Sequence, residues 1–521
     1  MARLFEYQSK EILKAKGIKV PEFKVASSPD EVYRIVEEMK KPVVLKIQLW
    51  KTGRKSIGGV KFAYTASEAA EISKEFLGMK VDEFKVDRVL IEEKLDIDKE
   101  MFAGIIIDDT EKKPLLIFSS KGGSGIEDIA KEFPDSIVKF HIDIKEGLPQ
   151  YRAREIAKKA GIKGKLLIKI GDYLSKLYLV MKDYDARSCE TNPIVVTKEG
   201  NVYAADAHIV IDDYAVYRHK DLGIEIAREF SRPATELEKI AFKVEENDYR
   251  GTFYFFQMKV DVPKDCKHIG FHGAGGGGSM MSMDAVVNKG FKMANFTDTS
   301  GNPPSSKVYR AAMIILSQPN IVGYFASGSG IASQEQYNSA RGFVKAFLED
   351  DIDIPAVLRL GGNYEEKAIE ILDTYLKDFK VEGYGKDDSP SFCAERIEKV
   401  VEENGRRLHK VKPLKEFVPS DDMFVIETIT GTIYIDHKKC QTCETKACIK
   451  ECAFGVLKED EGVPVNAMEF EIIKRGKCTE CLACEIACRF DGKGSLYIYL
   501  PIPGLKEYRD QIIRRYNVNT D

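Results

Sequence analysis

The chain lacks any long apolar run. No stretch of its 521 residues approaches the ~20 apolar residues that a membrane-spanning helix needs. Its start, Met-Ala-Arg-Leu-Phe-Glu-Tyr-Gln, carries charges where a signal peptide has its apolar segment, so we expect no signal peptide. The net charge of −4 and the lack of a strongly basic domain argue against nucleic acid as the main partner. These observations predict a soluble cytoplasmic protein, and the length predicts roughly three domains.

Cysteines in the pattern of a disulfide framework are lacking as well. Eight of the eleven cysteines fall in two short runs, and only Cys189, Cys266 and Cys393 lie elsewhere. This distribution argues against a disulfide framework and favours a reducing compartment.

The two runs have the spacing of iron–sulfur ligands. The first reads C-x2-C-x4-C-x3-C and the second C-x2-C-x2-C-x3-C. In two-cluster ferredoxins the fourth cysteine of each run binds the cluster of the other run. The pattern predicts two [4Fe-4S] clusters, one held by Cys440, Cys443, Cys448 and Cys488, the other by Cys478, Cys481, Cys484 and Cys452.

Zinc is the alternative occupant of these runs, because CxxC pairs also bind zinc. Two zinc sites would leave the trailing Cys452 and Cys488 unexplained, so we prefer iron and sulfide. One difference from common ferredoxin runs is that Ala453 and Arg489 stand where proline usually follows the last cysteine. We expect this difference to affect solvent access and potential, and not ligation.

A glycine-rich basic loop near the N-terminus is a candidate phosphate site. A strand predicted over residues 42–47 runs into the loop 50–61, which precedes a second strand. Backbone N–H groups of such a loop can approach phosphate oxygens closely, and Lys46 and Arg54 supply positive charge. A solvated hairpin is the alternative reading of such a turn.

Acidic and amide side chains further along add a candidate metal site. A strand over residues 88–91 ends at Glu92, and Glu100 precedes another strand. Asn192 heads a strand, and a hairpin leads from it to Asp206. An amide and a carboxylate on adjacent strands suit Mg²⁺, which takes few protein oxygens and completes its shell with nucleotide phosphates.

The middle of the chain repeats the order strand, small-residue loop, helix. Strands are predicted over 268–272, 321–326 and 355–360, and helices over 280–288 and 334–348. This order predicts an open parallel α/β sheet, whose glycine-rich loops lie at strand ends and helix N-termini, where anions bind. The alternative is that the glycines only make tight turns. His272, beside the first loop, is a phosphorylation candidate, but an ordinary strand-end histidine is the stronger interpretation.

The motifs together resemble the beta subunit of succinyl-CoA synthetase. The matching segments are Glu6-Tyr7-Gln8, Gly17 to Pro21, Lys46-x-Gln48, Gly53-Arg54, Gly58 to Lys61, Asp96 to Glu100, Gly122-Gly123-x-x-Ile126-Glu127, Glu190-x-Asn192-Pro193, Gly273 to Met283, Gly328 to Ile331 and Arg359-Leu-x-Gly362-Asn363. The resemblance implies an ATP-grasp domain in which Lys46, Gly53, Arg54, Glu92 and Glu100 surround ATP while Asn192 and Asp206 hold Mg²⁺. It also implies that Gly273, Gly275, Gly276, Gly328, Gly330 and Asn363 form the ligase loops.

Several residues depart from the family pattern. Lys55 replaces the second glycine of Gly-Arg-Gly, and Ala205 to His208 replaces Leu-Asp-Gly-Lys around Asp206. Ala274 stands at the family asparagine, and Gly361 at the family glutamate of Arg-Leu-Glu-Gly-Asn. The last two fall where the resemblance places the carboxylate substrate, so we expect an acid other than succinate.

The predicted fold class is α/β multidomain. An ATP-grasp domain is expected over 1–235, a flavodoxin-like ligase domain over 236–388 and a helix and linker over 389–422. A two-cluster ferredoxin-like domain is expected over 423–502 and a helical tail over 503–521.

The expected function is that of a beta subunit of an ADP-forming acid–CoA ligase. The resemblance implies that a partner alpha subunit carries the phosphohistidine and most of the CoA site, so we expect a hetero-oligomer. The alternative is a redox subunit that keeps the ligase scaffold for binding nucleotide or acyl-CoA and serves a 2-oxoacid or aldehyde:ferredoxin oxidoreductase. A milder variant makes the clusters structural or oxygen-sensing.

Overall fold

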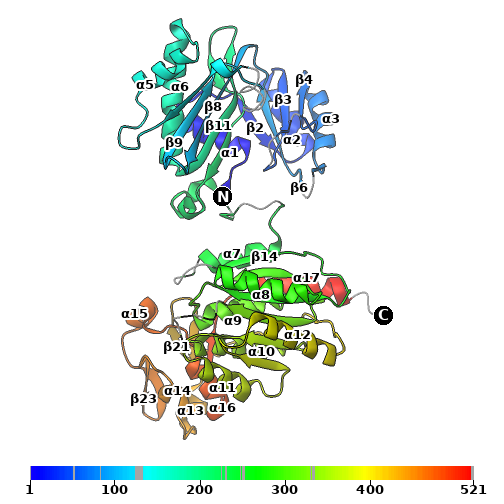
Figure 1. Cartoon of the computed structure of the whole chain (residues 1–521), viewed down its shortest axis with the longest axis vertical. Helices are drawn as coiled ribbons and strands as arrows, with labels where there is room; N and C mark the ends of the chain where they lie inside the picture. The colour runs from blue at the N-terminus through cyan, green and yellow to red at the C-terminus, as the bar shows by residue number, and fades with distance from the viewer. Residues whose placement is uncertain are drawn as a thin grey trace. The chain divides into compact units, whose positions relative to one another are not determined.

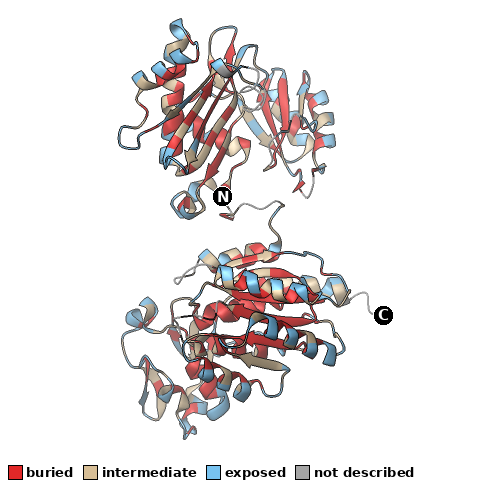
Figure 2. Cartoon of the chain, viewed as in Figure 1, coloured by how far each residue is buried: buried red, intermediate tan, exposed pale blue. Residues whose placement is uncertain are grey.

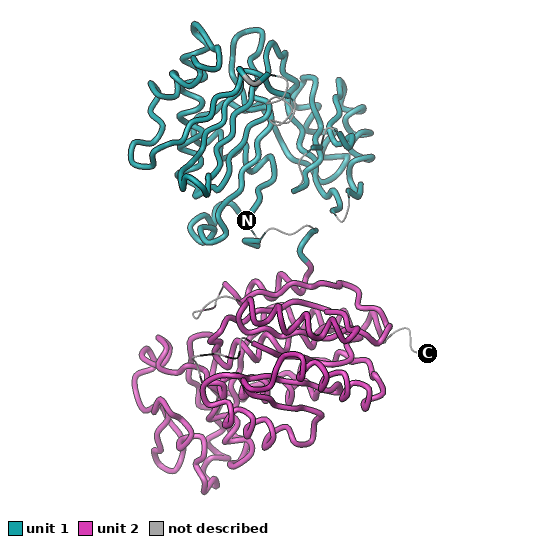
Figure 3. Tube along the Cα trace, in the orientation of Figure 1, with its two compact units in different colours: residues 1–234 teal, residues 235–521 magenta. Residues whose placement is uncertain are grey.

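The computed structural model describes residues 2–50, 53–54, 56–81, 84–123, 133–224, 226–228, 232–246, 248, 253–328, 330, 332 and 335–517. They form two compact units, residues 1–234 and 235–521 (Figure 3). None of the helices formed by these residues has the length and apolar character that crossing a membrane requires.

The first unit contains two main antiparallel sheets (Figure 1). The larger has the strand order β1-β13-β11-β8-β9-β10, with β12 beside β11, and the smaller has the order β2-β7-β3-β4. The strands are β1 (Ala2–Arg3), β2 (Phe23–Ala26), β3 (Val43–Ile47), β4 (Val60–Ala63), β5 (Lys80–Val81), β6 (Phe84–Lys85), β7 (Val89–Glu93), β8 (Ile97–Asp108), β9 (Lys113–Ser119), β10 (Ile137–His141), β11 (Ala186–Thr197), β12 (Val202–Ala204) and β13 (His208–Ile211).

Helices cover these sheets through apolar faces. They are α1 (Glu6–Ala15), α2 (Pro29–Met39), α3 (Ala66–Phe76), α5 (Gln150–Lys159) and α6 (Gly164–Asp183). Leu174 and Leu177 of α6 are buried with Ile105 and Leu116 of the larger sheet. Val32 of α2 belongs to the core of the smaller sheet. Local signals start α2, since Ser28 accepts a hydrogen bond from the Glu31 amide and Pro29 occupies the first turn.

The second unit is built on a mostly parallel sheet with the order β14-β17-β15-β18-β19-β20, and β16 pairs with β15. The predicted parallel α/β sheet is therefore present, with the antiparallel strand β14 at one edge. Buried residues concentrate in its strands (Figure 2). Its elements are α7 (Glu236–Glu246), β14 (Tyr254–Gln257), β15 (His268–Ala274), α8 (Gly276–Asn288), β16 (Lys292–Met293), β17 (Asn295–Asp298), α9 (Ser305–Ile315), β18 (Gly323–Gly328), α10 (Tyr337–Asp350), β19 (Ala356–Arg359), α11 (Glu365–Tyr375), β20 (Val381–Tyr384) and α12 (Pro390–Glu403).

The cysteine-rich region follows in the same unit. It contains the three-stranded sheet β21-β22-β25 and the hairpin β23-β24. Its elements are β21 (Phe424–Glu427), β22 (Thr432–Ile435), α13 (His437–Gln441), α14 (Ala447–Lys450), β23 (Leu457–Asp460), β24 (Val463–Asn466), α15 (Phe470–Ile472), α16 (Ala483–Asp491), β25 (Leu496–Tyr499) and α17 (Leu505–Asn517). Apolar side chains of this region and of the parallel sheet form one continuous core, which includes Ala312, Phe347, Leu482 and Leu505.

Several predicted boundaries differ from the observed ones by a few residues, and two of them involve glycines. Helix α8 begins at Gly276, four positions before the predicted start at residue 280. Strand β18 extends through Gly328, which was expected in a loop. In both cases glycine has a low intrinsic preference for the element, and tertiary packing at the sheet edge overrides that preference.

The last helix is fixed by a fully buried arginine. Arg509 of α17 pairs with Asp350 Oδ1 at 2.7 Å and donates to Ser317 Oγ at 2.7 Å and to Met313 O at 3.0 Å. Both members of the pair are almost completely inaccessible to solvent. Helix α17 is therefore part of the core of the second unit.

Candidate functional site

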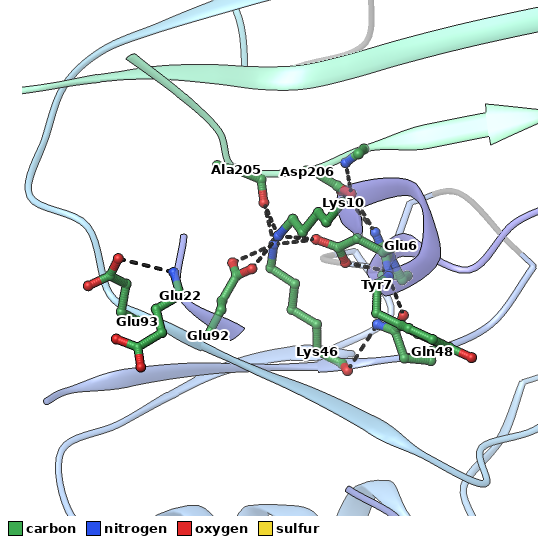
Figure 4. Close-up of polar contacts among 12 residues, drawn as sticks. Glu6, Tyr7, Lys10, Glu22, Lys46, Gln48, Glu92, Glu93, Ala205 and Asp206 are labelled. Atoms are coloured by element: carbon green, nitrogen blue, oxygen red, sulfur yellow. Dashed lines mark hydrogen bonds and ion pairs between the residues drawn. The ribbon is translucent and has the colours of Figure 1, made fainter. Parts of the chain in front are cut away.

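A buried network of charged side chains lies where the two sheets of the first unit meet α1 (Figure 4). Its members are Glu6, Lys10, Lys46, Arg54, Glu92 and Asp206. Lys46 Nζ lies 2.9 Å from Glu6 Oε1 and 2.7 Å from Glu92 Oε1, and it donates to Ala205 O at 2.7 Å. The predicted nucleotide-site residues Lys46, Arg54 and Glu92 are thus brought together with the predicted metal ligand Asp206.

Lys10 belongs to this network, although no motif in the sequence singles it out. Its Nζ lies 2.7 Å from Glu6 Oε1, contacts Glu92, and donates to Ala205 O at 2.8 Å. Glu6 and Lys10 are four residues apart on α1, which places them on one face of the helix. For Lys10, this spacing from Glu6 is the sequence signal that could have identified it.

The charges of the network balance, with three cations and three carboxylates. Burial alone would raise the pKa of Glu6, but Arg54, then Lys10 and Lys46, together hold that pKa well below its usual range. The Glu6 and Glu92 carboxylates raise the pKa of Lys46 against the opposing effect of burial. Glu6 and Lys46 are therefore held in their charged forms, and a phosphate entering here meets a fixed positive charge on Lys46.

Asp206 is bound on both carboxylate oxygens by one arginine. Arg54 Nη2 lies 2.7 Å from Oδ1 and 2.9 Å from Oδ2, while Nη1 lies 2.7 Å from Glu6 Oε2. Asp206 follows β12 in a turn, and was expected on a strand. A metal ion at Asp206 therefore requires Arg54 to move away from it.

Two other expected residues, Asn192 and Glu100, lie around the loop that follows β9. Asn192 Oδ1 accepts a hydrogen bond from the Gly123 amide at 3.2 Å. A Cβ added at Gly123 would lie 2.1 Å from Glu100 Oε2, so Glu100 reaches the same loop. Gly53 has a φ of +74°, which suits glycine. Lys55, Ile126 and Glu127 lie outside the described residues.

Burial, and then the charge of Asp206, raise the pKa of Glu190, so this carboxylate lies close to the expected metal ligands. In the part of the chain that the structure describes, no group of three or more His, Cys, Asp or Glu side chains is arranged to hold a metal ion. Mg²⁺ at Asn192 and Asp206 would need oxygens from a nucleotide to complete its shell, as is usual for this ion.

The ligase loops of the second unit meet at the carboxyl ends of β15, β18 and β19. Parallel pairing places Ala274 beside Gly328, and Ser327 beside Arg359. A cavity of ≈ 30 Å³ lies between these ends, with His272, Ala274, Gly328, Arg359 and Gly361 among its lining residues. This volume holds about two water molecules, so an organic acid needs the loops to open.

The predicted loop glycines have different structural roles. A Cβ at Gly273 would lie 2.5 Å from Thr297 O, and one at Gly330 would lie 2.8 Å from Arg359 Nη2, so each allows close packing. Gly275 has a φ of +89° and donates its amide to Asp298 Oδ1 at 2.8 Å. Gly276 begins α8.

The third ligase loop carries Asn363. Its amide donates to Ala332 O at 3.2 Å, and its carbonyl accepts from the Gln336 amide at 2.8 Å. Ser329 and Ile331, in the loop after β18, lie outside the described residues. The backbone of Asn363 therefore links the ends of β19 and α10.

His272 and Arg359 are engaged in structural contacts. His272 is buried, its Nδ1 lies 2.6 Å from the Tyr324 hydroxyl, and burial lowers its pKa to about 3. Arg359 donates to the carbonyls of Gly328 and Lys386, both at 3.0 Å, and to that of Asp388. These contacts favour the interpretation of His272 as an ordinary strand-end histidine.

The structure brings the eight run cysteines together in two sets. Burial, and then the neighbouring thiolates of Cys488, Cys440 and Cys443, raise the pKa of Cys448 to about 12. Burial, and then Cys481, Cys478 and Cys452, raise the pKa of Cys484 well above its usual value. The members of each set are those that the spacing predicts, including the exchange of the fourth cysteines. All eleven cysteines are free of disulfides.

The second set lines a small internal cavity of ≈ 20 Å³ together with Leu482 and Ile498. A backbone amide points at one sulfur atom of each set, since Val456 N donates to Cys452 Sγ in the second set and Ser495 N to Cys488 Sγ in the first, both at 3.2 Å. Crowded, buried thiolates with N–H···S contacts need positive charge in their midst, and the irons of a [4Fe-4S] cluster supply it. The donor set therefore fits this cofactor.

A buried glutamate fixes the loop between Cys478 and Cys481. Glu480 accepts hydrogen bonds from Thr428 Oγ1 at 2.8 Å and from the amide and hydroxyl of Thr430, both at 2.6 Å. The three donors are two threonine hydroxyls and one threonine amide, and they come from a hairpin about 50 residues earlier. The sequence therefore did not indicate this role.

Comparisons with known proteins show the family of the chain. A family model described as an ATP-grasp domain matches residues 3–196. The "Succinate--CoA ligase [GDP-forming] subunit beta" of Thermus thermophilus is 39% identical over 371 residues, covering 71% of this chain and 93% of that protein. The "Succinate--CoA ligase [ADP-forming] subunit beta" of Ignicoccus hospitalis is 36% identical over 372 residues, with the same two shares.

Among solved structures, ATP citrate lyase from Methanothrix soehngenii, in complex with citrate and coenzyme A, superposes with a TM-score of 0.62. That match covers 76% of this chain and 99% of the other, at 18% identity, and so indicates a shared fold.

Proposed function

Because the chain belongs to the family of succinate–CoA ligase beta subunits, as its motifs predict, we propose that it is the nucleotide-binding subunit of an ADP-forming ligase. This family is one of acid–CoA ligases. We also propose that the chain carries two [4Fe-4S] clusters. The observation that carries the ligase part is the buried network of Lys46, Arg54, Glu92 and Asp206. A charge-neutral network with one movable arginine is suited to receive an anionic phosphate and a cation together.

Arg54 has the central part in this proposal. Its guanidinium leaves Asp206 and turns to the phosphates of ATP, which are stronger bidentate acceptors, while Lys46 stays in place. Asp206 and Asn192 are then free to hold Mg²⁺, with Glu100 nearby. When bound, Mg²⁺ neutralises the charge that develops on the transferring phosphoryl group.

The rest of the reaction requires a partner. We propose that an alpha subunit carries the histidine that is phosphorylated and most of the CoA site, and that the carboxylate substrate reacts at the loops after β15, β18 and β19. The purified chain alone is expected to show no ligase turnover. Phosphate release that depends on ATP, CoA and an acid should appear when an alpha subunit is added, and full turnover by the single chain would contradict the proposal.

The acid is proposed to differ from succinate. The departures Ala274 and Gly361 lie in the wall of the small cavity. A Cβ at position 361 would lie 2.8 Å from the Lys386 Cα and 2.9 Å from the Gly330 Cα, so the glutamate of the family does not fit this backbone. Comparing succinate with acetate, aromatic and longer acids in the reconstituted assay tests this point, and a strict preference for succinate would refute it.

The iron–sulfur part is supported by the two cysteine sets and their N–H···S contacts. Anaerobically purified or reconstituted protein should contain iron and acid-labile sulfide in equal amounts and give the EPR signals of reduced cubane clusters. The variant Cys484→Ser should lose roughly half of the iron, since it removes one ligand of one cluster. Stoichiometric zinc without sulfide would overturn this part.

The second candidate function is that of a redox subunit. It is favoured by the size of the cavity between β15, β18 and β19, which at ≈ 30 Å³ admits no organic acid unless the surrounding loops open. In that case the chain serves a 2-oxoacid or aldehyde:ferredoxin oxidoreductase. Anaerobic co-purification separates the two, because the ligase proposal requires a CoA-binding partner and the redox proposal requires an oxidoreductase.

A further inference from the structure

The cysteine set Cys452, Cys478, Cys481 and Cys484 lies next to the wall of the ligase cavity. Cys481 O accepts a hydrogen bond from Ser305 Oγ at 3.2 Å, and the same hydroxyl contacts Asn338 O at 2.7 Å. Ser305 starts α9, and Asn338 lies in the first turn of α10. One hydroxyl therefore joins the cluster loop to both helices.

The same two helices form one side of the ligase cavity. Pro303 and Val308 line it from α9 and the turn before it, and Gln336, Ser339 and Phe343 line it from the start of α10. The cluster loop contacts these helices at Ser305, between the lining positions of α9. Helices α9 and α10 thus contact both the cavity and the cluster loop.

The wall is tightly packed. At Gly342 of α10, an added Cβ would lie 2.6 Å from Ser305 O and 2.7 Å from Val308 Cβ. Ser305, Val308, Ser339 and Phe343 are all buried. Bulk water is thus excluded from the wall, so charges on its two sides are weakly screened.

A second contact holds the cluster helix against α10. Lys345 Nζ lies 2.7 Å from Glu485 Oε1 and 2.7 Å from Glu349 Oε1, and its side chain is 3% exposed. Glu485 is on α16, directly after Cys484. Helix α10 therefore carries residues of the cavity wall in its first two turns, and in its next turn Lys345, which pairs with Glu485 beside the cluster.

We propose that the ligase cavity and the cluster of Cys452, Cys478, Cys481 and Cys484 are thermodynamically linked, so that an anion bound in the cavity disfavours reduction of that cluster. This inference rests on the proposed [4Fe-4S] cofactor. Reduction adds one electron to the cluster from an external one-electron donor and changes no bond. Linkage is reciprocal, so reduction weakens anion binding by the same factor.

The size of the effect follows from the width of the wall. A helix with its side chains is about 10–12 Å across. Two unit charges at that separation, at the effective dielectric typical of protein sites, change an equilibrium about tenfold. For one electron this factor corresponds to a shift of ~59 mV. The ligand class is a phosphate or carboxylate, because the cavity lies at parallel strand ends beside the N-terminus of α8.

The linkage gives the clusters a role in the ligase reaction without making them reactants. When the one-electron donors that reduce the cluster are themselves mostly reduced, the chain releases its acidic ligand more readily. When these donors are mostly oxidised, the chain retains that ligand. The clusters would thus report the redox state of the cell to the acid–CoA equilibrium.

The test is an EPR-monitored redox titration of the full-length holoprotein. It is run with saturating inorganic phosphate and with chloride at matched ionic strength. We expect phosphate to lower the potential of one cluster by ~59 mV, a tenfold change for one electron, and to move the other cluster less. The variant Cys484→Ser identifies the near cluster by the signal that it removes.

Equilibrium dialysis should show that the reduced protein binds phosphate about tenfold more weakly than the oxidised protein. The variant Gly275→Ala, strained at a φ of +89°, should lose phosphate binding and the shift while keeping both potentials in chloride. Bound phosphate with no shift in either cluster, or no phosphate binding in either state, would overturn the linkage. A protein without cubane signals would instead overturn the proposed cofactor.

Discussion

Replacing Lys10 by methionine tests whether the buried network is needed for the fold of the first unit. Lys10 is fully buried, and its ammonium serves Glu6, Glu92 and the Ala205 carbonyl. Methionine fills a similar volume but leaves three carboxylates opposite two cations around a fully buried position. Breaking a buried pair in this way costs about 3–5 kcal/mol. For a unit of this size, the unfolding midpoint should fall by roughly 6–20 °C.

The measurement is calorimetric or proteolytic unfolding of the full chain, following the first unit. Lys24→Met is the matched control, because Lys24 pairs with Glu38 at 2.7 Å while both side chains are half-exposed or more. Exposed pairs contribute about 0–1 kcal/mol, so this control should melt within a few degrees of the wild type. The double variant Lys10→Met/Glu92→Gln should recover part of the loss, since it restores charge balance. If Lys10→Met melts like Lys24→Met, the network does not stabilise the unit and the reasoning is wrong.

Three further predictions follow from the same contacts. The variant Glu6→Gln tests the contribution of the Glu6 carboxylate to the free energy of unfolding. Because the folded state lowers the pKa of Glu6, this contribution is complete above the ordinary pKa of 4.5 and is lost as the pH falls toward the lowered pKa. Acid denaturation curves of the wild type and the variant should therefore converge at low pH. In Asp206→Asn, ATP binding measured by calorimetry should lose most of its Mg²⁺ dependence, and unchanged Mg²⁺ dependence would exclude Asp206 as a ligand. In Arg509→Met, the unpaired Asp350 should cost the second unit about 3–5 kcal/mol in urea unfolding, whereas Arg515→Met, which breaks an exposed pair, should change little.

The sequence was most informative where ligands are close along the chain. The spacing of the cysteine runs predicted both sets in the structure, because short gaps oblige neighbouring thiolates to face one site. The lysine, arginine and carboxylates of the first unit were selected on motif resemblance, and they meet in one network. The parallel sheet followed from the repeated order of strand, glycine-rich loop and helix.

The sequence was least informative where charged side chains are buried by partners far away in the chain. Lys10, Lys345 and Arg509 all look like surface residues of amphipathic helices. Their burial depends on carboxylates that are 82, 140 and 159 residues away. The cysteine-rich region likewise looked like an appendage joined by a linker, whereas its apolar residues share a core with the parallel sheet. Patterns of local periodicity carry no information about such pairings.

The burial of Arg509 also bears on how the protein is made. All described elements of the first unit pair within residues 1–234, so this unit can fold on the ribosome while the rest is being translated. The second unit is completed later, because Asp350 at the end of α10 pairs with Arg509, which emerges late from the exit tunnel. This pair forms only after about 160 further residues have been made, including all eight run cysteines. With the proposed cofactor, loading of iron and sulfide and completion of the second unit are therefore both late events in synthesis.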